Sequence, residues 1–266
     1  MHCNSVVSLV RAGSLDEVSA IRKLAISLLF LVPLYLLVLS SASASVLVSP
    51  SPGALLAWPS DVGNLGYRAH WLTSLRVEAR QASDDNEPYL ANRLWAQLAQ
   101  EGDRDAAFQL GLFYDLGEVE ARNARRAVYW YRQAAEAGEI HAQHNLGVAY
   151  AKGDGIALDI NQAIKWWTLA ARRGNADSQY NLGILYAVGE YGIKQDIDQA
   201  KHWWRRAAMR GDPMAQYNLG TLYVNNGVHD YCEATRWWEE AARNGVEQAS
   251  LALRVIKTRQ DYRACQ

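Results

Sequence analysis

The chain repeats itself with a period in the mid-thirties, and this period constrains its fold more than any other feature. Three columns of identical residues are each separated by 36, 36, 37 and 34 positions. They are the leucines Leu110, Leu146, Leu182, Leu219 and Leu253, the alanines Ala91, Ala127, Ala163, Ala200 and Ala234, and the glycines Gly102, Gly138, Gly174, Gly211 and Gly245. Columns that share one irregular spacing are not expected by chance, and this period is typical of solenoids of helix pairs. We therefore predict an all-α chain.

The first helix of each repeat is predicted from apolar residues at helical spacing. In the second repeat, Ala142, Leu146 and Tyr150 fall on one stripe of a helix, which we expect to be buried. Gly147 lies in the middle of this helix, where glycine costs about 1 kcal/mol relative to alanine. The same cost recurs at Gly111, Gly183 and Gly220. A repeated cost indicates that a neighbouring helix approaches closely, and we expect tryptophan to fill this contact.

The second helix of each repeat begins at a polar residue four positions before the marker alanine. These predicted N-caps, whose side-chain oxygens accept hydrogen bonds from free backbone amides, are Asn123, Asp159, Asp196 and Asp230, with Glu87 in the same place before Pro88. In the second repeat, Ala163, Trp166 and Trp167 then follow on one inward-facing stripe. Gly174 is expected to close this helix in the left-handed conformation.

The recurring pattern of A, LG, Y, G.G, D, A, WW, AA and G resembles the Sel1-like repeat, a relative of the tetratricopeptide repeat. The resemblance implies a right-handed α-solenoid of Sel1-like helix pairs. Four complete units span 103–138, 139–174, 175–211 and 212–245, and a half unit at each end extends the solenoid to 88–260. A capping helix and turn at 61–87, ending its helix before Ser83, would cover the first face, and a tail follows at 261–266.

Residues 1–44 have the features of a secretory signal peptide. Arg22 and Lys23 precede an uncharged apolar run, and Ala42-Ser43-Ala44 forms a small-residue cleavage site. We expect cleavage after Ala44, and a linker rich in proline and serine follows at 45–60.

An uncleaved inner-membrane anchor is the alternative to a cleaved signal. It would give the chain a membrane tether through residues 24–48, because this segment carries no charge. With cleavage the protein would be periplasmic or secreted, and with an anchor the repeats would still lie in the periplasm.

Charge and cysteine content exclude some classes of partner. A formal net charge of −1 provides no basic field, so we expect no nucleic-acid partner. The three cysteines have no spacing that suggests zinc, so no metal site is expected. Loss of Cys3 with the signal would leave Cys232 and Cys265 as a possible disulfide. The axes of neighbouring helices lie at about the largest separation that a disulfide can bridge, so two free thiols are an equal alternative.

We predict no catalytic site and no cofactor. Eight of the ten tryptophans fall in second helices and could stack on sugars, but they share the alanine stripe, so we interpret them as packing residues. His144 falls in a column of aromatic residues and His202 on a solvated face, and neither has a recurring nucleophile or carboxylate beside it. Gly153-Asp154-Gly155 is interpreted as a turn, because it lacks the other ligands of a calcium or phosphate loop.

A polar stripe runs along the first helices and provides the candidate partner-binding residues. The polar stripe consists of Gln109, Asn145, Lys152, Asn181, Asn218 and Asn225. First helices line the concave wall of stacked helix pairs, so the amides would form a ladder along this wall. An amide can both donate and accept, which suits the backbone of an extended peptide. Alternatively, the amides brace neighbouring turns.

The resemblance to Sel1-like proteins implies a non-catalytic scaffold or adaptor of the bacterial cell envelope. Its partner would be an envelope protein or an extended peptide, bound on the concave surface. A cell-wall-acting enzyme or wall-fragment binder is the alternative, because cysteine-rich relatives have been associated with beta-lactam binding or hydrolysis. This chain lacks the cysteine pairs of those relatives, so we expect no enzyme. Should the polar stripe not bind, the convex face offers basic residues for an acidic partner, namely Arg132, Lys165, Arg172, Lys201, Arg205, Arg236 and Arg243.

Overall fold

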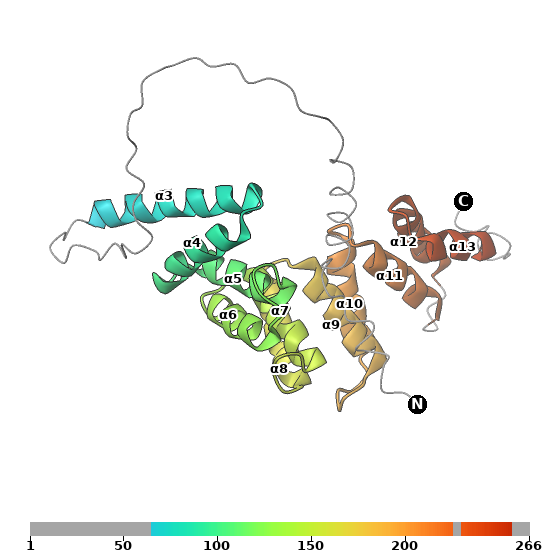
Figure 1. Cartoon of the computed structure of the whole chain (residues 1–266). Coiled ribbons are helices and arrows are strands. Elements are labelled where there is room, and N and C mark those ends of the chain that lie inside the picture. The colour runs from blue at the N-terminus through green and yellow to red at the C-terminus, as the bar shows by residue number, and fades with distance from the viewer. Residues whose placement is uncertain (1–64, 226–229, 257–266) are drawn as a thin grey trace, which may run out of the picture. The chain divides into compact units, whose positions relative to one another are not determined.

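A computed structural model of the protein describes residues 65–225 and 230–256 (Figure 1). These residues form eleven helices and no strand, which confirms the predicted all-α class. None of the described helices has both the length and the hydropathy that crossing a membrane requires. The predicted signal peptide or anchor, the linker at 45–60 and the tail at 261–266 lie outside the described residues.

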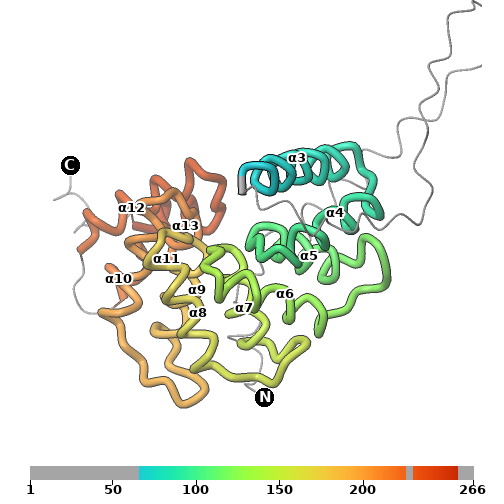
Figure 2. Tube along the Cα trace, turned by 90° about the vertical axis from the view of Figure 1, so that its left-hand side faces the viewer, coloured from blue at the N-terminus to red at the C-terminus, as the bar shows by residue number. Residues whose placement is uncertain are grey.

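First and second helices alternate along the repeats (Figure 2). The first helices are α5 (Arg104–Leu116), α7 (Ile140–Lys152), α9 (Ala176–Val188) and α11 (Pro213–Asn225). The second helices are α6 (Ala124–Glu136), α8 (Ile160–Arg172), α10 (Ile197–Ala208) and α12 (Tyr231–Arg243). A lone second helix, α4 (Pro88–Gln100), precedes them, and a lone first helix, α13 (Glu247–Ile256), follows. From α4 to α13 each helix packs against the next along the chain, as in an α-solenoid.

Polar N-caps begin the second helices where the sequence predicts them. Each cap accepts a hydrogen bond from the backbone amide three residues later, at 2.9–3.1 Å, in the pairs Asn123–Arg126, Asp159–Gln162, Asp196–Gln199 and Asp230–Glu233. Glu87 stands at the N-cap of α4, but its side chain accepts no capping bond, and Pro88 follows at the start of the helix. Gly174 follows α8 with a φ of +97°, which confirms the left-handed closure.

An aromatic ring of the second helix lies against each mid-helix glycine, as the repeated glycine cost predicts. A Cβ atom added to Gly147 would lie 2.5 Å from Cδ1 of Trp167, whose side chain is 1% exposed. The other pairs are Gly183 with Trp204, Gly220 with Trp238, and Gly111 with Tyr131, which takes the place of tryptophan in the first repeat. Even a methyl group would therefore push the paired helices apart, so the two helices of each repeat meet through glycine and an aromatic ring.

Buried glutamines connect successive repeats, a role that the sequence analysis did not identify. The side-chain nitrogens of Gln143, Gln179 and Gln216 each donate to the backbone carbonyl eight residues earlier, at 3.2, 2.8 and 3.1 Å. All three side chains are buried. The accepting carbonyls lie in the last turn of the preceding second helix, where each also accepts the backbone amide of the glycine three residues later. The glutamines therefore fix α7, α9 and α11 each to the second helix before it.

The last turns of α3 (Leu65–Asp84) belong to the same compact unit as the repeats. Ser83 donates to the carbonyl of Ala79 at 3.0 Å and accepts a hydrogen bond from Nε1 of Trp95 at 3.1 Å. The sequence pattern predicts that this helix ends before Ser83, whereas these two bonds keep Ser83 inside it. Arg76 forms an ion pair with Asp103, the N-cap of α5.

Candidate interaction surface

The members of the polar stripe lie on the first helices but differ in exposure. Gln109, Asn145, Lys152 and Asn218 are half-buried, and Asn225 at the end of α11 is exposed. Asn181 departs from its column, because only 1% of it is exposed. A partner can therefore reach five of the six predicted residues, and Asn181 contributes no accessible surface.

Asn145 also has a bracing contact. Its side chain lies near enough to the hydroxyl of Tyr131 to interact with it, and the hydroxyl donates to Asp115 Oδ2 at 3.3 Å. Burial, followed by the negative charge of Asp115, raises the pKa of Tyr131 well above its ordinary value. Tyr131 therefore stays neutral and donates to the carboxylate. In the second repeat, Asn145 therefore braces Tyr131 and also contributes to the partly exposed polar stripe.

Arg122 joins the first two repeats through two carboxylates. Its Nη2 atom lies 2.7 Å from Oδ1 of Asp115 and also pairs with Asp154 in the turn of the next repeat. The hydrogen bond to Asp154 is the main cause that raises the pKa of this guanidinium above its ordinary value. Asp154 thus braces a turn between repeats, which supports the interpretation of Gly153-Asp154-Gly155 as a structural turn.

His144 and Ser178 form a buried pair between the second and third repeats. Nδ1 of His144 lies 2.9 Å from Oγ of Ser178, and their exposed fractions are 4% and 0%. Burial lowers the pKa of His144 to about 3, so the imidazole is neutral at pH 7. A serine beside a histidine resembles part of a hydrolase site, but a substrate cannot reach atoms this deeply buried. The pair instead links α7 to α9, in the column of aromatic residues where the sequence placed His144.

The tryptophans and His202, which the sequence offered as candidates for a binding or catalytic site, are packing and surface residues. Seven of the eight tryptophans of the second helices are buried, and Trp130 is half-buried, which confirms the packing interpretation. His202 is exposed, as predicted, and its ring contacts that of Trp203 edge-on. Within residues 65–225 and 230–256 no three His, Cys, Asp or Glu side chains gather as metal ligands.

Cys232 lies in the first turn of α12 and is disulfide-bonded. Cys265, its predicted partner, lies outside the described residues, so the pairing of these two cysteines stays a prediction.

The repeat boundaries are matched by a known family model. The model described as Sel1 repeat matches residues 104–139, 140–175, 176–212 and 213–246, more than half of the chain. The chain belongs to the Sel1 repeat family. The four matched ranges each begin one residue after the units that the sequence pattern predicts. Sel1 repeats therefore cover every first helix of the polar stripe.

Two solved structures of Sel1 type resemble this Sel1 repeat chain. A Sel1 repeat protein from Oxalobacter formigenes is 29% identical, with a TM-score of 0.61, over 66% of this chain and 72% of that one. The protein c5321, a protective antigen present in uropathogenic Escherichia coli strains that displays an SLR fold, is 28% identical, with a TM-score of 0.60. That alignment covers 64% of this chain but only 37% of c5321. No curated protein sequence matches the chain.

Proposed function

We propose that this Sel1 repeat chain is a non-catalytic scaffold of the bacterial cell envelope, which holds a partner protein or an extended peptide on its polar stripe. Sel1 repeat proteins are generally protein-interaction scaffolds. The observation that carries the proposal is the recurrence of partly exposed polar groups, among them Asn145 and Asn218, on the first helices α5, α7 and α11, with an interruption at α9 where Asn181 is buried. Packing occupies the leucine, alanine and tryptophan columns, so on the first helices these groups are the recurring ones left within reach of a partner.

The envelope location is proposed from the N-terminal sequence. The basic residues, the apolar run and the Ala42-Ser43-Ala44 site have the order of a secretory signal. Export should produce a mature chain that begins at Ser45, and N-terminal sequencing of periplasmic protein checks this. An intact N-terminus on membrane-bound protein would instead establish the anchor, with the repeats still in the periplasm.

The alternative of a cell-wall-acting enzyme is less favoured, because the histidine–serine pair and the Gly-Asp-Gly turn both have structural roles. His144 and Ser178 are buried, and Asp154 is paired with Arg122. These residues therefore have structural roles and do not supply an accessible nucleophile with an adjacent base.

Affinity measurements on two pairs of variants test the binding surface. The full chain is used to capture partners from envelope extract, and the captured protein is identified and titrated against the variants. Asn145→Ala with Asn218→Ala should weaken its binding about tenfold or more, because a lost hydrogen bond contributes roughly 0.5–1.5 kcal/mol. Gln133→Ala with Asn161→Ala removes two amides from exposed positions of α6 and α8 and should leave binding unchanged. Equal binding by both pairs would show that the polar stripe is not the partner site.

A further inference from the structure

Two cavities of nearly equal size lie at equivalent positions of successive repeats. Their volumes are about 580 and 590 Å³. Each is lined by a residue from one second helix, a tyrosine from the following first helix and the N-cap aspartate of the next second helix. The matching residues are Ile164, Tyr186 and Asp196 in the first cavity, and Lys201, Tyr223 and Asp230 in the second. The repeat thus places two hollows in sequence along its second-helix side.

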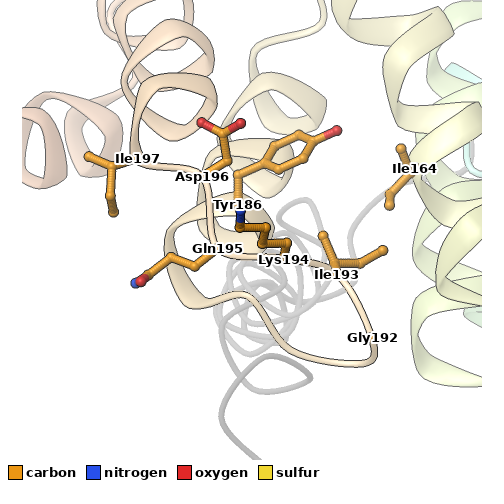
Figure 3. A pocket seen from close by; sticks show the side chains of 8 residues that line it. All are labelled: Ile164, Tyr186, Gly192, Ile193, Lys194, Gln195, Asp196 and Ile197. Carbon is orange, nitrogen blue, oxygen red and sulfur yellow. The ribbon is translucent and has the colours of Figure 1, made fainter.

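The first cavity combines an apolar wall with a polar one, because Lys194, Gln195 and Asp196 line it together with the isoleucines. Ile193 in the turn and Ile164 on α8 face one side of it, with the ring of Tyr186 near them (Figure 3). All three side chains are half-buried. In the neighbouring repeats an arginine covers the matching tyrosine, because Arg132 donates to the hydroxyl of Tyr150 at 3.2 Å and Arg205 to that of Tyr223. The matching residue on α8 is Thr168, which is too short for this role, so no residue of α8 places a cation over Tyr186 and the isoleucine wall stays open.

The second cavity has cationic walls. The ammonium of Lys201 lies 4.4 Å from the centre of the Tyr223 ring, and Arg205 contacts the hydroxyl of the same tyrosine. Tyr223 itself is buried, with 3% exposed, so the two cations lie over a tyrosine that holds them in place. Ile164 of the first cavity is replaced here by Lys201, which puts a cation in place of an aliphatic side chain on the wall formed by the second helix.

The acidic residues of the second cavity already have partners. Glu233 pairs with Arg236 at 3.1 Å, and Asp230 Oδ1 accepts the backbone amide of Glu233 at 3.0 Å. Among the described residues, neither Lys201 nor Arg205 forms an ion pair. A carboxylate entering this cavity would therefore meet two cations without displacing an existing ion pair.

From this arrangement we infer that the second-helix side of the third and fourth repeats binds an extended peptide of a partner protein, with a large aliphatic side chain in the first cavity and an Asp or Glu side chain in the second. Both cavities have volumes typical of binding pockets. Complementary chemistry at two sites selects a partner more sharply than either site alone. This surface is independent of the polar stripe, so it does not require the proposed function.

The repeat also limits the spacing of the two side chains. Successive second helices are separated by one first helix, so their axes lie at most about 16–20 Å apart, two helix spacings. An extended chain covers this distance in about five or six residues. Peptides whose two side chains lie two to six residues apart therefore cover the separations that are possible between the two cavities.

Defined peptides titrated against the full chain test the inference. Fluorescent Gly/Ser peptides carry one Leu and one Glu, two to six residues apart and in both orders. One spacing and order should bind about tenfold more tightly than peptides with Leu alone, with Glu alone, or with Lys in place of Glu. Binding of all these peptides with equal affinity, or of none with a dissociation constant below about 1 mM, overturns the inference.

Charge reversal locates the binding within the second cavity. Lys201→Glu should weaken the Leu–Glu peptide about tenfold and favour the Leu–Lys peptide. The matched control is Lys165→Glu, because Lys165 makes the same cation contact with a ring on α8 but lines neither cavity. Arg205→Gln is the second test variant if Lys201→Glu does not fold by circular dichroism. Equal effects of the test and control substitutions overturn the assignment to this cavity, and Asn145→Ala with Asn218→Ala should leave peptide binding unchanged.

Discussion

The interior of each helix pair and the polar stripe of the same first helices follow one period, yet only the interior keeps one structure from repeat to repeat. Each mid-helix glycine meets an aromatic ring, whether the ring is Trp167 or, in the first repeat, Tyr131. In the polar stripe, by contrast, Asn145 is half-buried and lies near Tyr131, whereas Asn181 is buried. Close packing tolerates few alternatives, while a side chain at the surface adjusts to its local neighbours. Substitutions in the two regions should therefore differ strongly in their effect on stability.

The largest loss is expected for Trp167→Ala. Trp167 is 1% exposed and fills the space beside Gly147, so truncation leaves a large cavity. The free energy of unfolding should fall by about 3–5 kcal/mol, as urea denaturation would measure. Trp130→Ala makes the same substitution at a half-buried site and should cost clearly less. Similar losses of unfolding free energy for both variants would mean that the contact of Trp167 with Gly147 stabilises the fold no more than a half-buried tryptophan does.

A smaller loss of stability is expected at acidic pH from the buried imidazole of His144. Burial lowers the pKa of His144 from 6.5 to about 3, so between these values the unfolded chain binds a proton that the folded chain excludes. Stability is therefore full above about pH 6.5 and lost as the pH falls, by roughly 2 kcal/mol between pH 7 and 5. His144→Phe should remove this part of the pH dependence in urea denaturation. An unchanged pH profile in this variant would show that His144 is not responsible.

Substitutions in the glutamine column should cause an intermediate loss of stability. Gln179→Met removes the hydrogen bond to the carbonyl of Ala171, which keeps its bond from the amide of Gly174. The expected loss is about 1 kcal/mol, because the acceptor is not left unpaired. Gln195 makes the same type of bond, to Ala187 at 2.8 Å, but at an exposed site, so Gln195→Met is the matched control and should have almost no effect. Thermal melting of both variants checks this difference, and equal melting temperatures would contradict it.

The smallest effect is expected in the polar stripe. Asn145→Ala and Asn218→Ala should each reduce the free energy of unfolding by about 1 kcal/mol or less. Asn145→Ala should cost the more of the two, because it also breaks the contact with Tyr131. Urea denaturation of the single variants measures the order. A loss approaching that of Trp167→Ala would show that the polar stripe is structural and would remove the contrast between the two regions.

The helix pairs could be predicted because their causes are local and repeated. The N-cap Asp159, for instance, lies three residues before the amide that it caps, and Gly147 indicates a close contact before its partner is known. The glutamine column was missed, although Gln143, Gln179 and Gln216 recur with the period, because an amide at such a position can brace a helix or face a partner. A test for recurrence alone cannot separate these two roles.

The candidate interaction surfaces could not be predicted in the same way, because they combine residues that lie far apart in the sequence. Asp115 and Asp154 lie 39 positions apart, and only the folded chain shows that Arg122 joins them. The two cavities likewise combine residues from two second helices, a turn and a first helix. Their different linings arise from single differences between repeats, such as Ile164 against Lys201, which the common pattern does not reveal.

The sequence by itself determined the family, the helix pairs, their caps and the packing role of the tryptophans, because periodic local patterns specify each of these within one repeat. Only the tertiary structure decided which polar residues remain accessible and where hollows form, because both depend on how one repeat stacks on the next. Asn145 and Asn181 show the difference. They occupy the same place in the repeat, and the stacking of their neighbours leaves one half-exposed and the other buried.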